Sequence, residues 1–234
     1  AFGEGVRTFE RILNEYPDSR HASTIGGQLV DVYMNTKSYS IALESINKIK
    51  NPSRDILKAK QNILYRLGVQ EFINGNYRMS IDYMNRSLEL ARFDGTTKAD
   101  ALFWKGEALY KTGDQAAAEK LYRQAAALKG SYGNKATYNV GYIEFQNQEY
   151  DKARNAFMQF VNNPRGESKE IIADAYSRIG DCYYYQRQFA TAKQYYDKAT
   201  SVDSKNADYA LFRTAITQGM EKAYTAKATT LKQL

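Results

Sequence analysis

The sequence contains one cysteine, one histidine and three prolines in 234 residues, and it has no long hydrophobic run. With Cys182 alone, neither an internal disulfide nor a multi-cysteine zinc site can form. His21 is the sole imidazole, which excludes a two-histidine metal site. No apolar stretch approaches the roughly 18 residues that a membrane-spanning helix needs. The composition therefore excludes disulfide-stapled, multi-cysteine zinc and transmembrane proteins.

What the sequence does contain is a mixed, mildly basic set of charges and many tyrosines. The 33 lysines and arginines exceed the 26 aspartates and glutamates by 7, and this excess is spread evenly along the chain. Nucleic-acid-binding proteins more often gather their basic residues in a patch or stripe. Hydrophobic residues make up 43% and charged residues 25%, which is typical of a globular chain, whereas 20 tyrosines stand out.

A repeated pattern runs through most of the chain. Four segments align without gaps, and each ends in a glycine: Gly68, Gly106, Gly141 and Gly180. Twelve residues after each glycine stands a small residue: Ser80, Ala118, Ala153 and Ala192. Four residues further on stands a bulky one: Met84, Tyr122, Phe157 and Tyr196. Self-similarity at a fixed period is the mark of a repeat architecture.

The pattern extends in weaker form to both ends. An earlier unit has Val30 at the glycine position, Ala42 at the small position and Ile46 at the bulky position. A degenerate last unit has Ala215 and Leu231 at the glycine and bulky positions. We expect a piece of a longer array, because the pattern predicts that the chain opens inside one helix at Ala1 and stops inside another at Leu234.

Helix pairs follow from the spacing within each unit. Apolar residues recur at helical intervals, and all three prolines fall where a second helix should end. Gly75 and Gly113 mark the predicted turn between paired helices, and we expect the small residue of each unit to face the repeat glycine across the pair. Asp18, Ser19 and Ser53 stand where helix N-caps are expected.

The four segments resemble the tetratricopeptide repeat, whose signature is W-x2-L-G-x2-Y, then A-x3-F, then P. The resemblance implies an all-α superhelix, or solenoid, of about five helix pairs with partial units at the ends. The predicted array is a single domain over residues 1–234. Its expected divisions are a partial unit at 1–18, repeats at 19–52, 53–92, 96–130, 134–164 and 169–204, and a degenerate unit at 205–234.

Three features of the sequence could carry chemistry. Cys182 has no histidine nearby in sequence to act as its base, so we interpret it as a packed core residue and not a nucleophile. His21 is interpreted as a surface or capping residue. Glu107 and Asp181 lie two units apart, too far for acid–base work, and are expected to be solvated charges on the inner surface. We predict no enzyme activity, cofactor or metal.

In the resembled family, the first helix of each unit lines a concave groove. Tyr122, Tyr176 and Tyr196 are expected to pack between helices, and the family's groove positions, at which Phe72 and Phe145 also fall, predict an aromatic surface with scattered charge. The predicted partner-binding residues are Tyr65, Phe103, Glu107, Tyr110, Lys111, Lys135, Tyr138, Tyr142, Asp174, Asp181, Tyr184 and Tyr185. Tyrosine gives large contact area at low entropic cost. Packing against further repeats or partner helices is the alternative role for these side chains.

The best function hypothesis is a non-enzymatic scaffold that binds a polypeptide segment in this groove. The family's clamp for a C-terminal carboxylate uses lysine and asparagine at two groove positions. Those two positions read Tyr65/Val69, Phe103/Glu107, Tyr138/Tyr142 and Ser177/Asp181 here, so that clamp is absent. A helical-repeat RNA-binding protein and a non-catalytic part of a larger enzyme are the alternatives, and exposed array ends allow self-association.

Two sequence segments point to a narrower group of proteins within the resembled family. Residues 9–19 are similar to the helix ends of envelope tetratricopeptide proteins, and residues 173–184 are similar to units of large repeat proteins in Bacteroidetes-type bacteria. These segments imply a bacterial, periplasmic or envelope-associated protein. The low thiol count fits a reducing cytoplasm equally well, so that location stays open.

Overall fold

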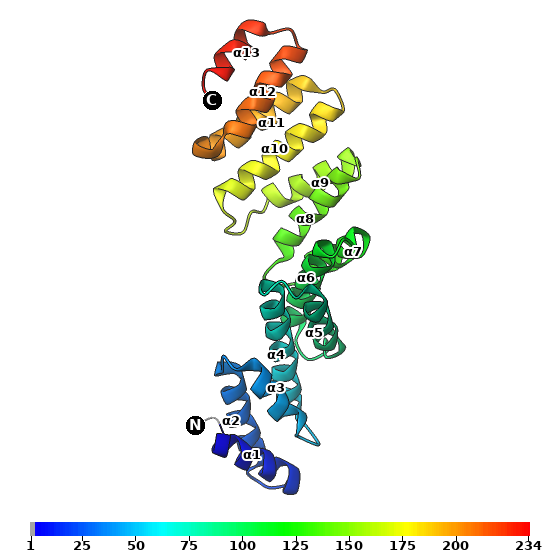
Figure 1. Ribbon diagram of the computed structural model, residues 1–234, viewed down its shortest axis with the longest axis vertical. Helices are drawn as coiled ribbons and strands as arrows, with labels where there is room; N and C mark the ends of the chain where they lie inside the picture. The colour runs from blue at the N-terminus through cyan, green and yellow to red at the C-terminus, as the bar shows by residue number, and fades with distance from the viewer. Residues whose placement is uncertain (1–2) are drawn as a thin grey trace. The chain divides into compact units, whose positions relative to one another are not determined.

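The computed structural model describes residues 3–234, and these residues form helices joined by short turns, with no strand among them (Figure 1). The all-α prediction is confirmed. The chain divides into two compact units that meet between Gly133 and Asn134. The expectation that the chain opens inside a helix falls on Ala1, outside the described residues.

From residue 3 onward, the first unit consists of seven helices that pack against their neighbours in sequence. They are α1 (Gly3–Glu15), α2 (Ala22–Asn35), α3 (Tyr39–Asn47), α4 (Arg54–Ile73), α5 (Tyr77–Glu89), α6 (Gly95–Lys111) and α7 (Gln115–Ala126). Helix α4 packs on α5, and α6 packs on α7. Leu29, Tyr33, Ile46 and Ile63 are buried in the core that α2, α3 and α4 share.

The second unit repeats this arrangement. Its helices are α8 (Gly133–Gln146), α9 (Tyr150–Val161), α10 (Lys169–Tyr185), α11 (Phe189–Val202), α12 (Asp208–Met220) and α13 (Tyr224–Leu231), with a 3-10 turn at Ser204–Asn206. Figure 1 shows α10 to α13 lying side by side in chain order. Phe157, Phe160 and Ile179 form one buried cluster, and Ala192, Tyr196 and Ala210 form another.

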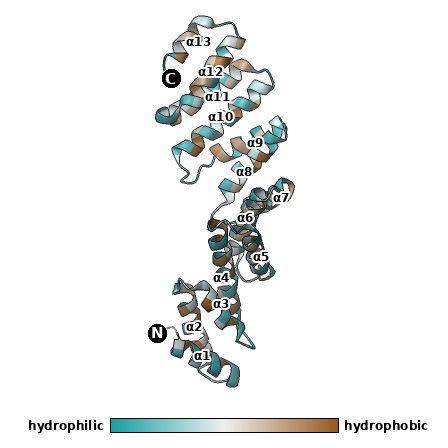
Figure 2. Ribbon diagram, viewed as in Figure 1, coloured by the Kyte–Doolittle hydropathy of each residue, from teal (hydrophilic) through white to brown (hydrophobic). Residues whose placement is uncertain are grey.

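Hydrophobic and hydrophilic residues are mixed along the helices of both units (Figure 2). This mixing is typical of helices that bury one face and expose the other. Within residues 3–234, no helix combines the length and the hydrophobicity needed to cross a membrane.

The repeat glycines make room for the bulky residue of the same unit, which corrects the prediction that the small residue faces them. A Cβ atom added at Gly106 would lie 2.9 Å from the Tyr122 ring, and one at Gly180 would lie 2.6 Å from the Tyr196 ring. The small residues are buried as well, but they are not among the atoms nearest to the glycines. The physical reason is that a ring needs the volume that the missing side chain leaves.

The turn between paired helices has one left-handed residue at the same place in five units. Gly75 and Gly113 have φ angles of 80° and 93°, which confirms their predicted role as turn residues. Gln148, Arg187 and Lys222 occupy the corresponding position with φ near 60°. In each turn the following amide donates to the carbonyl oxygen five residues before it, as in the hydrogen bond from Asn76 to Glu71. This pattern is the Schellman motif, which favours glycine because a Cβ is strained there.

We predict that Gln148→Gly and Arg187→Gly each raise the free energy of unfolding by about 0.5–1 kcal/mol. A left-handed conformation costs a residue with a Cβ about 1–2 kcal/mol, and the flexibility of glycine in the unfolded chain offsets part of the gain. Both side chains are exposed, so their removal costs little packing. Urea unfolding followed by circular dichroism measures the change. Gly113→Ala is the reverse control and should destabilise by about 1 kcal/mol, whereas a loss of stability in Gln148→Gly contradicts the account.

Helix starts agree with the sequence in one predicted place and differ in another. Ser53 caps α4, where its hydroxyl accepts a hydrogen bond from the Ile56 amide at 3.3 Å. Asp18 and Ser19 are not N-caps, because α2 begins at Ala22 and its cap position is His21.

At the C-terminal end, α13 stops at Leu231, so Leu234 is not inside a helix as predicted. Leu231 does not fill the bulky position, since its side chain is 40% exposed. Thr230 is buried in its stead and donates a hydrogen bond to Gln218 at 3.0 Å. A short helix with threonine at this place cannot bury a ring as the earlier units do.

Candidate functional site

The predicted groove residues of the first unit lie on α4 and α6 and differ in accessibility. Lys111 is exposed, whereas Tyr65, Glu107 and Tyr110 are half-buried. Phe103 is only 5% exposed, because its ring stacks on the Tyr132 ring with centroids 4.7 Å apart. Phe103 therefore supports the surface from beneath and is not placed to contact a partner.

Glu107 is not the free solvated charge that the sequence suggested. Its carboxylate accepts a hydrogen bond of 2.7 Å from the Tyr122 hydroxyl. Tyr122 is the buried ring that packs against Gly106, so this bond ties the inner surface of α6 to the core of the helix pair. Burial also raises the pKa of Tyr65 on the neighbouring α4 further above neutral pH.

In the second unit, three predicted residues come together in one cluster. Tyr138 and Tyr142, one turn apart on α8, both donate hydrogen bonds to the Asp174 carboxylate on α10, with a distance of 2.7 Å for Tyr138. Burial, followed by the Asp174 charge, raises the pKa of Tyr142 to about 12 and raises that of Tyr138 further. Both phenols are therefore held as neutral donors.

Asp181 is the centre of a second cluster, and the expectation that it is solvated is wrong. Asp181 is only 1% exposed. Two arginines contact its carboxylate at 2.8 Å, Arg178 from the same helix and Arg213 from α12. The hydroxyls of Tyr196 and Tyr209 donate to it at 2.9 and 2.7 Å. A buried carboxylate needs such compensation because burial disfavours an isolated charge.

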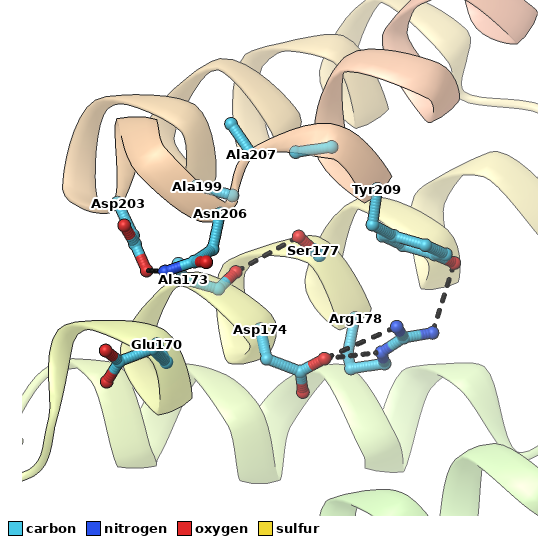
Figure 3. Close-up of a pocket in the computed structure, with 11 residues that line it drawn as sticks. Glu170, Ala173, Asp174, Ser177, Arg178, Ala199, Asp203, Asn206, Ala207 and Tyr209 are labelled. Carbon is cyan, nitrogen blue, oxygen red and sulfur yellow. Dashed lines mark hydrogen bonds and ion pairs between the residues drawn. The ribbon is translucent and has the colours of Figure 1, made fainter. Parts of the chain in front are cut away.

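Arg178 joins the two clusters, and Figure 3 shows its contacts with Asp174 and Tyr209. Arg178 pairs with Asp174 at 3.3 Å and with Asp181 at 2.8 Å, and its guanidinium lies over the Tyr209 ring. Burial alone lowers the pKa of Arg178, but the Asp174 and Asp181 charges outweigh it and raise that pKa above its ordinary value. With Arg213 included, two carboxylates balance two guanidiniums, so the network is electrically neutral and fixed.

The remaining predicted residues of this unit are more accessible. Lys135 is exposed at the start of α8. Tyr184 is half-buried beneath the Arg213 guanidinium, whose carbon lies 4.2 Å from the ring centroid. Tyr185 is 54% exposed and stacks on Tyr150 with centroids 5.1 Å apart. Tyr185 is thus a large, accessible aromatic held in one orientation by a neighbouring ring.

Sequence reasoning missed four residues of this surface: Arg178, Tyr209, Phe212 and Arg213. Arg178 stands four residues after Asp174 and three before Asp181, a spacing that places all three on one helix face. Tyr209, Phe212 and Arg213 belong to the degenerate last unit, at or next to the groove positions used for the other units. Counting the same groove positions in the last unit, whose first helix is α12, would have found these three residues.

A pocket of about 310 Å³ opens beside this network, between α10 and α12 (Figure 3). Its walls combine small residues with polar groups: Glu170, Ala173, Asp174, Ser177, Arg178, Ala199, Asp203, Asn206, Ala207, Tyr209 and Ala210. Asp203 accepts a hydrogen bond from Asn206 at 2.8 Å. The polar groups at the pocket are thus largely engaged with one another or with the backbone, an arrangement that fixes the shape of this surface.

The cysteine and the histidine lie in very different surroundings. Cys182 is fully buried, and burial raises the pKa of its thiol to about 12, so the reactive thiolate is absent at neutral pH. His21 is exposed at the cap of α2 and accepts a hydrogen bond from the Arg20 side chain at 3.0 Å.

Successive helix pairs, three of which seat an aromatic ring against a helix glycine, define the class of the protein as an α-helical repeat protein. More particularly, the chain contains tetratricopeptide repeats, because models of that repeat match residues 60–130 and 173–206. Among curated proteins, none has a significant sequence match to the chain.

Solved structures of similar fold include two named proteins. MamA of Desulfovibrio magneticus RS-1, from residue 41 to its end, is 16% identical with a TM-score of 0.62, and the match covers 74% of this chain and 92% of that one. PilF of Pseudomonas aeruginosa is 17% identical with a TM-score of 0.59, and the match covers 77% and 76%. At these identities the likeness supports the fold and nothing more.

Proposed function

We propose that the chain is a non-enzymatic protein-interaction scaffold that binds a polypeptide segment along its first-helix face, the surface formed by the first helix of each pair. One observation carries the proposal. On the neighbouring first helices α10 and α12, Tyr185, Tyr209 and Phe212 are each more than 40% exposed, and apolar surface that gathers on one face marks an interaction site.

The ordering of these rings supports polypeptide binding. Tyr209 is held by its hydrogen bond to Asp181, and Tyr185 by stacking on Tyr150. A ring that is already fixed loses little entropy when a partner binds, so more of the contact energy appears as affinity. The charges beneath are neutralised in pairs, which favours a partner recognised by apolar contact and hydrogen bonds over a strongly charged one such as RNA.

Site-specific photocrosslinking tests the proposal. A photoreactive phenylalanine analogue at Tyr185 or Phe212 should form adducts in the cells that make this protein, and protease but not ribonuclease should remove the adduct mass. Gln194, exposed on the second helix α11, is the matched control position and should give no adduct. Equal labelling from Gln194, adducts removed by ribonuclease, or no adduct at either ring position contradicts the proposal.

The bacterial envelope is the location that we propose for this scaffold, on the strength of the helix-end phrase at residues 9–19. Cell fractionation with periplasmic and cytoplasmic marker proteins tests it. Recovery of the protein with the cytoplasmic markers contradicts the proposed location and leaves the scaffold function standing.

A further inference from the structure

A second pocket lies on the first unit, remote in sequence from the cluster around Asp181. It has a volume of about 570 Å³, and α4 supplies most of its wall. Tyr65, Val69 and Ile73 form an apolar strip along that helix, since residues four apart share a face. Ile73 is 73% exposed, so the strip reaches the surface.

An arginine stands beside this strip in a fixed position. The Nε atom of Arg66 donates to the Asn62 side-chain oxygen at 2.7 Å, and its Nη1 atom donates to the Tyr39 hydroxyl at 3.1 Å. The guanidinium also lies over the Tyr39 ring, 5.5 Å from its centroid. These contacts are all with neutral groups, so they orient the positive charge without neutralising it.

The charge at this pocket has no counter-charge within the part of the chain that the structure describes. Arg66 and Lys37 line the pocket, neither makes an ion pair there, and no carboxylate lines the wall. The acidic residue nearest in α4, Glu71, accepts a hydrogen bond from Asn76. The contrast with the second unit is clear, because Arg178 and Arg213 there both hold carboxylates.

We propose that this pocket binds an internal acidic side chain of a partner polypeptide, with an adjacent apolar side chain lying on the strip formed by Val69 and Ile73. The inference rests on the proposed scaffold function and gives the chemistry of the partner. The Nη2 atom of Arg66 makes no hydrogen bond to the described residues, and a planar guanidinium matches a carboxylate with two parallel bonds. A carboxylate therefore supplies the charge and the acceptors that the pocket lacks.

Peptide selection tests this chemistry. A phage-displayed library of random dodecapeptides is selected on the whole chain, and the enriched sequences are synthesised with amidated C-termini and measured by fluorescence anisotropy. We expect Asp or Glu beside an apolar residue in the enriched sequences. Arg66→Gln should weaken their binding tenfold or more, because hydrogen bonds to charged groups are the strong ones.

Arg86→Gln is the matched control. Arg86 also lies over a tyrosine ring, 5.3 Å from the Tyr83 centroid, but it is on the second helix α5 and pairs with Asp82. Its replacement should change affinity less than twofold. A second variant, Ile73→Asp, adds a negative charge at an exposed place and should weaken acidic peptides strongly even if Arg66→Gln proves unstable in a thermal unfolding control.

The outcomes separate the inference from the scaffold function. Enriched peptides that lack acidic residues, or that bind Arg66→Gln and Ile73→Asp as tightly as the parent, overturn the inference. Peptides that lose their binding when the C-terminus is amidated also overturn the inference, because the group bound is then the C-terminal carboxylate and not an internal acidic side chain. In each of these cases the crosslinking at Tyr185 and Phe212 still decides the scaffold function on its own. An absence of binding peptides overturns the inference, and absence of both peptides and adducts overturns both.

Discussion

Asp181→Ala is expected to lower the free energy of unfolding by about 3–5 kcal/mol, the range found when one member of a buried ion pair is removed. The loss is large because two guanidiniums, those of Arg178 and Arg213, remain in the interior without their shared carboxylate. The hydroxyls of Tyr196 and Tyr209 also lose their acceptor. Urea unfolding followed by circular dichroism measures the change.

A surface ion pair of the same length is the control. Lys193 and Asp197 on α11 are also 2.8 Å apart, but both side chains are substantially exposed. Asp197→Ala should therefore cost less than about 1 kcal/mol, since water screens and competes for exposed charges. A cost for Asp181→Ala as small as that for Asp197→Ala would show that the network is not a stabilising centre of the second unit.

Why the repeat could be recognised from sequence follows from local sterics. A glycine inside a helix is costly, so its recurrence in Gly68, Gly106, Gly141 and Gly180 signals a close approach that each unit needs. Proline cannot continue a helix, so Pro52 and Pro164 mark ends. These constraints act within one helix pair, which is why the helices are predictable in order and in approximate length.

Which residue fills the space at each glycine was not predictable from the same pattern. Both the small residue twelve positions later and the bulky residue sixteen positions later are buried, so hydrophobicity and phase do not distinguish them. The structure does, because the atoms nearest to a Cβ at position 180 all belong to the Tyr196 ring, although Ala192 is buried in the same cluster. The choice depends on how two helices cross, which no single-helix periodicity contains.

The burial of the charged groove residue Asp181 could not be predicted from the sequence, because it too depends on how helices pack together. Asp181 occupies a position that faces the groove in the resembled family, and its neighbours in sequence give no sign of burial. Its partners Tyr196, Tyr209 and Arg213 come from α11 and α12, 15 to 32 residues further along the chain. Only packing of three helices brings them together. Tyr185, by contrast, lies at the exposed end of α10, and one stacked ring, Tyr150, is enough to orient it.

Phe157→Ala is expected to cost about 3–5 kcal/mol of unfolding free energy and to reverse the sign of the effect of Gly141→Ala. The Phe157 side chain is fully buried, so its truncation removes apolar contacts and leaves a cavity. In the parent chain, a Cβ at position 141 would lie 2.9 Å from the Phe157 ring, closer than such atoms can approach. Gly141→Ala alone should therefore destabilise, by about 1–2 kcal/mol once its better helix propensity is counted.

In the Phe157→Ala background that clash is gone, and the same Gly141→Ala change should stabilise by up to about 1 kcal/mol because alanine favours the helix over glycine. The coupling energy from the double-mutant cycle is then about 2–3 kcal/mol. Gly68→Ala is the matched control, since its Cβ would meet the Met84 side chain, whose thioether is more adaptable than a ring and which belongs to a different helix pair from Phe157. Its effect should stay near zero in either background. If the effects of Gly141→Ala and Phe157→Ala on the free energy of unfolding are additive, the contact with the Phe157 ring is not the reason that position 141 requires glycine.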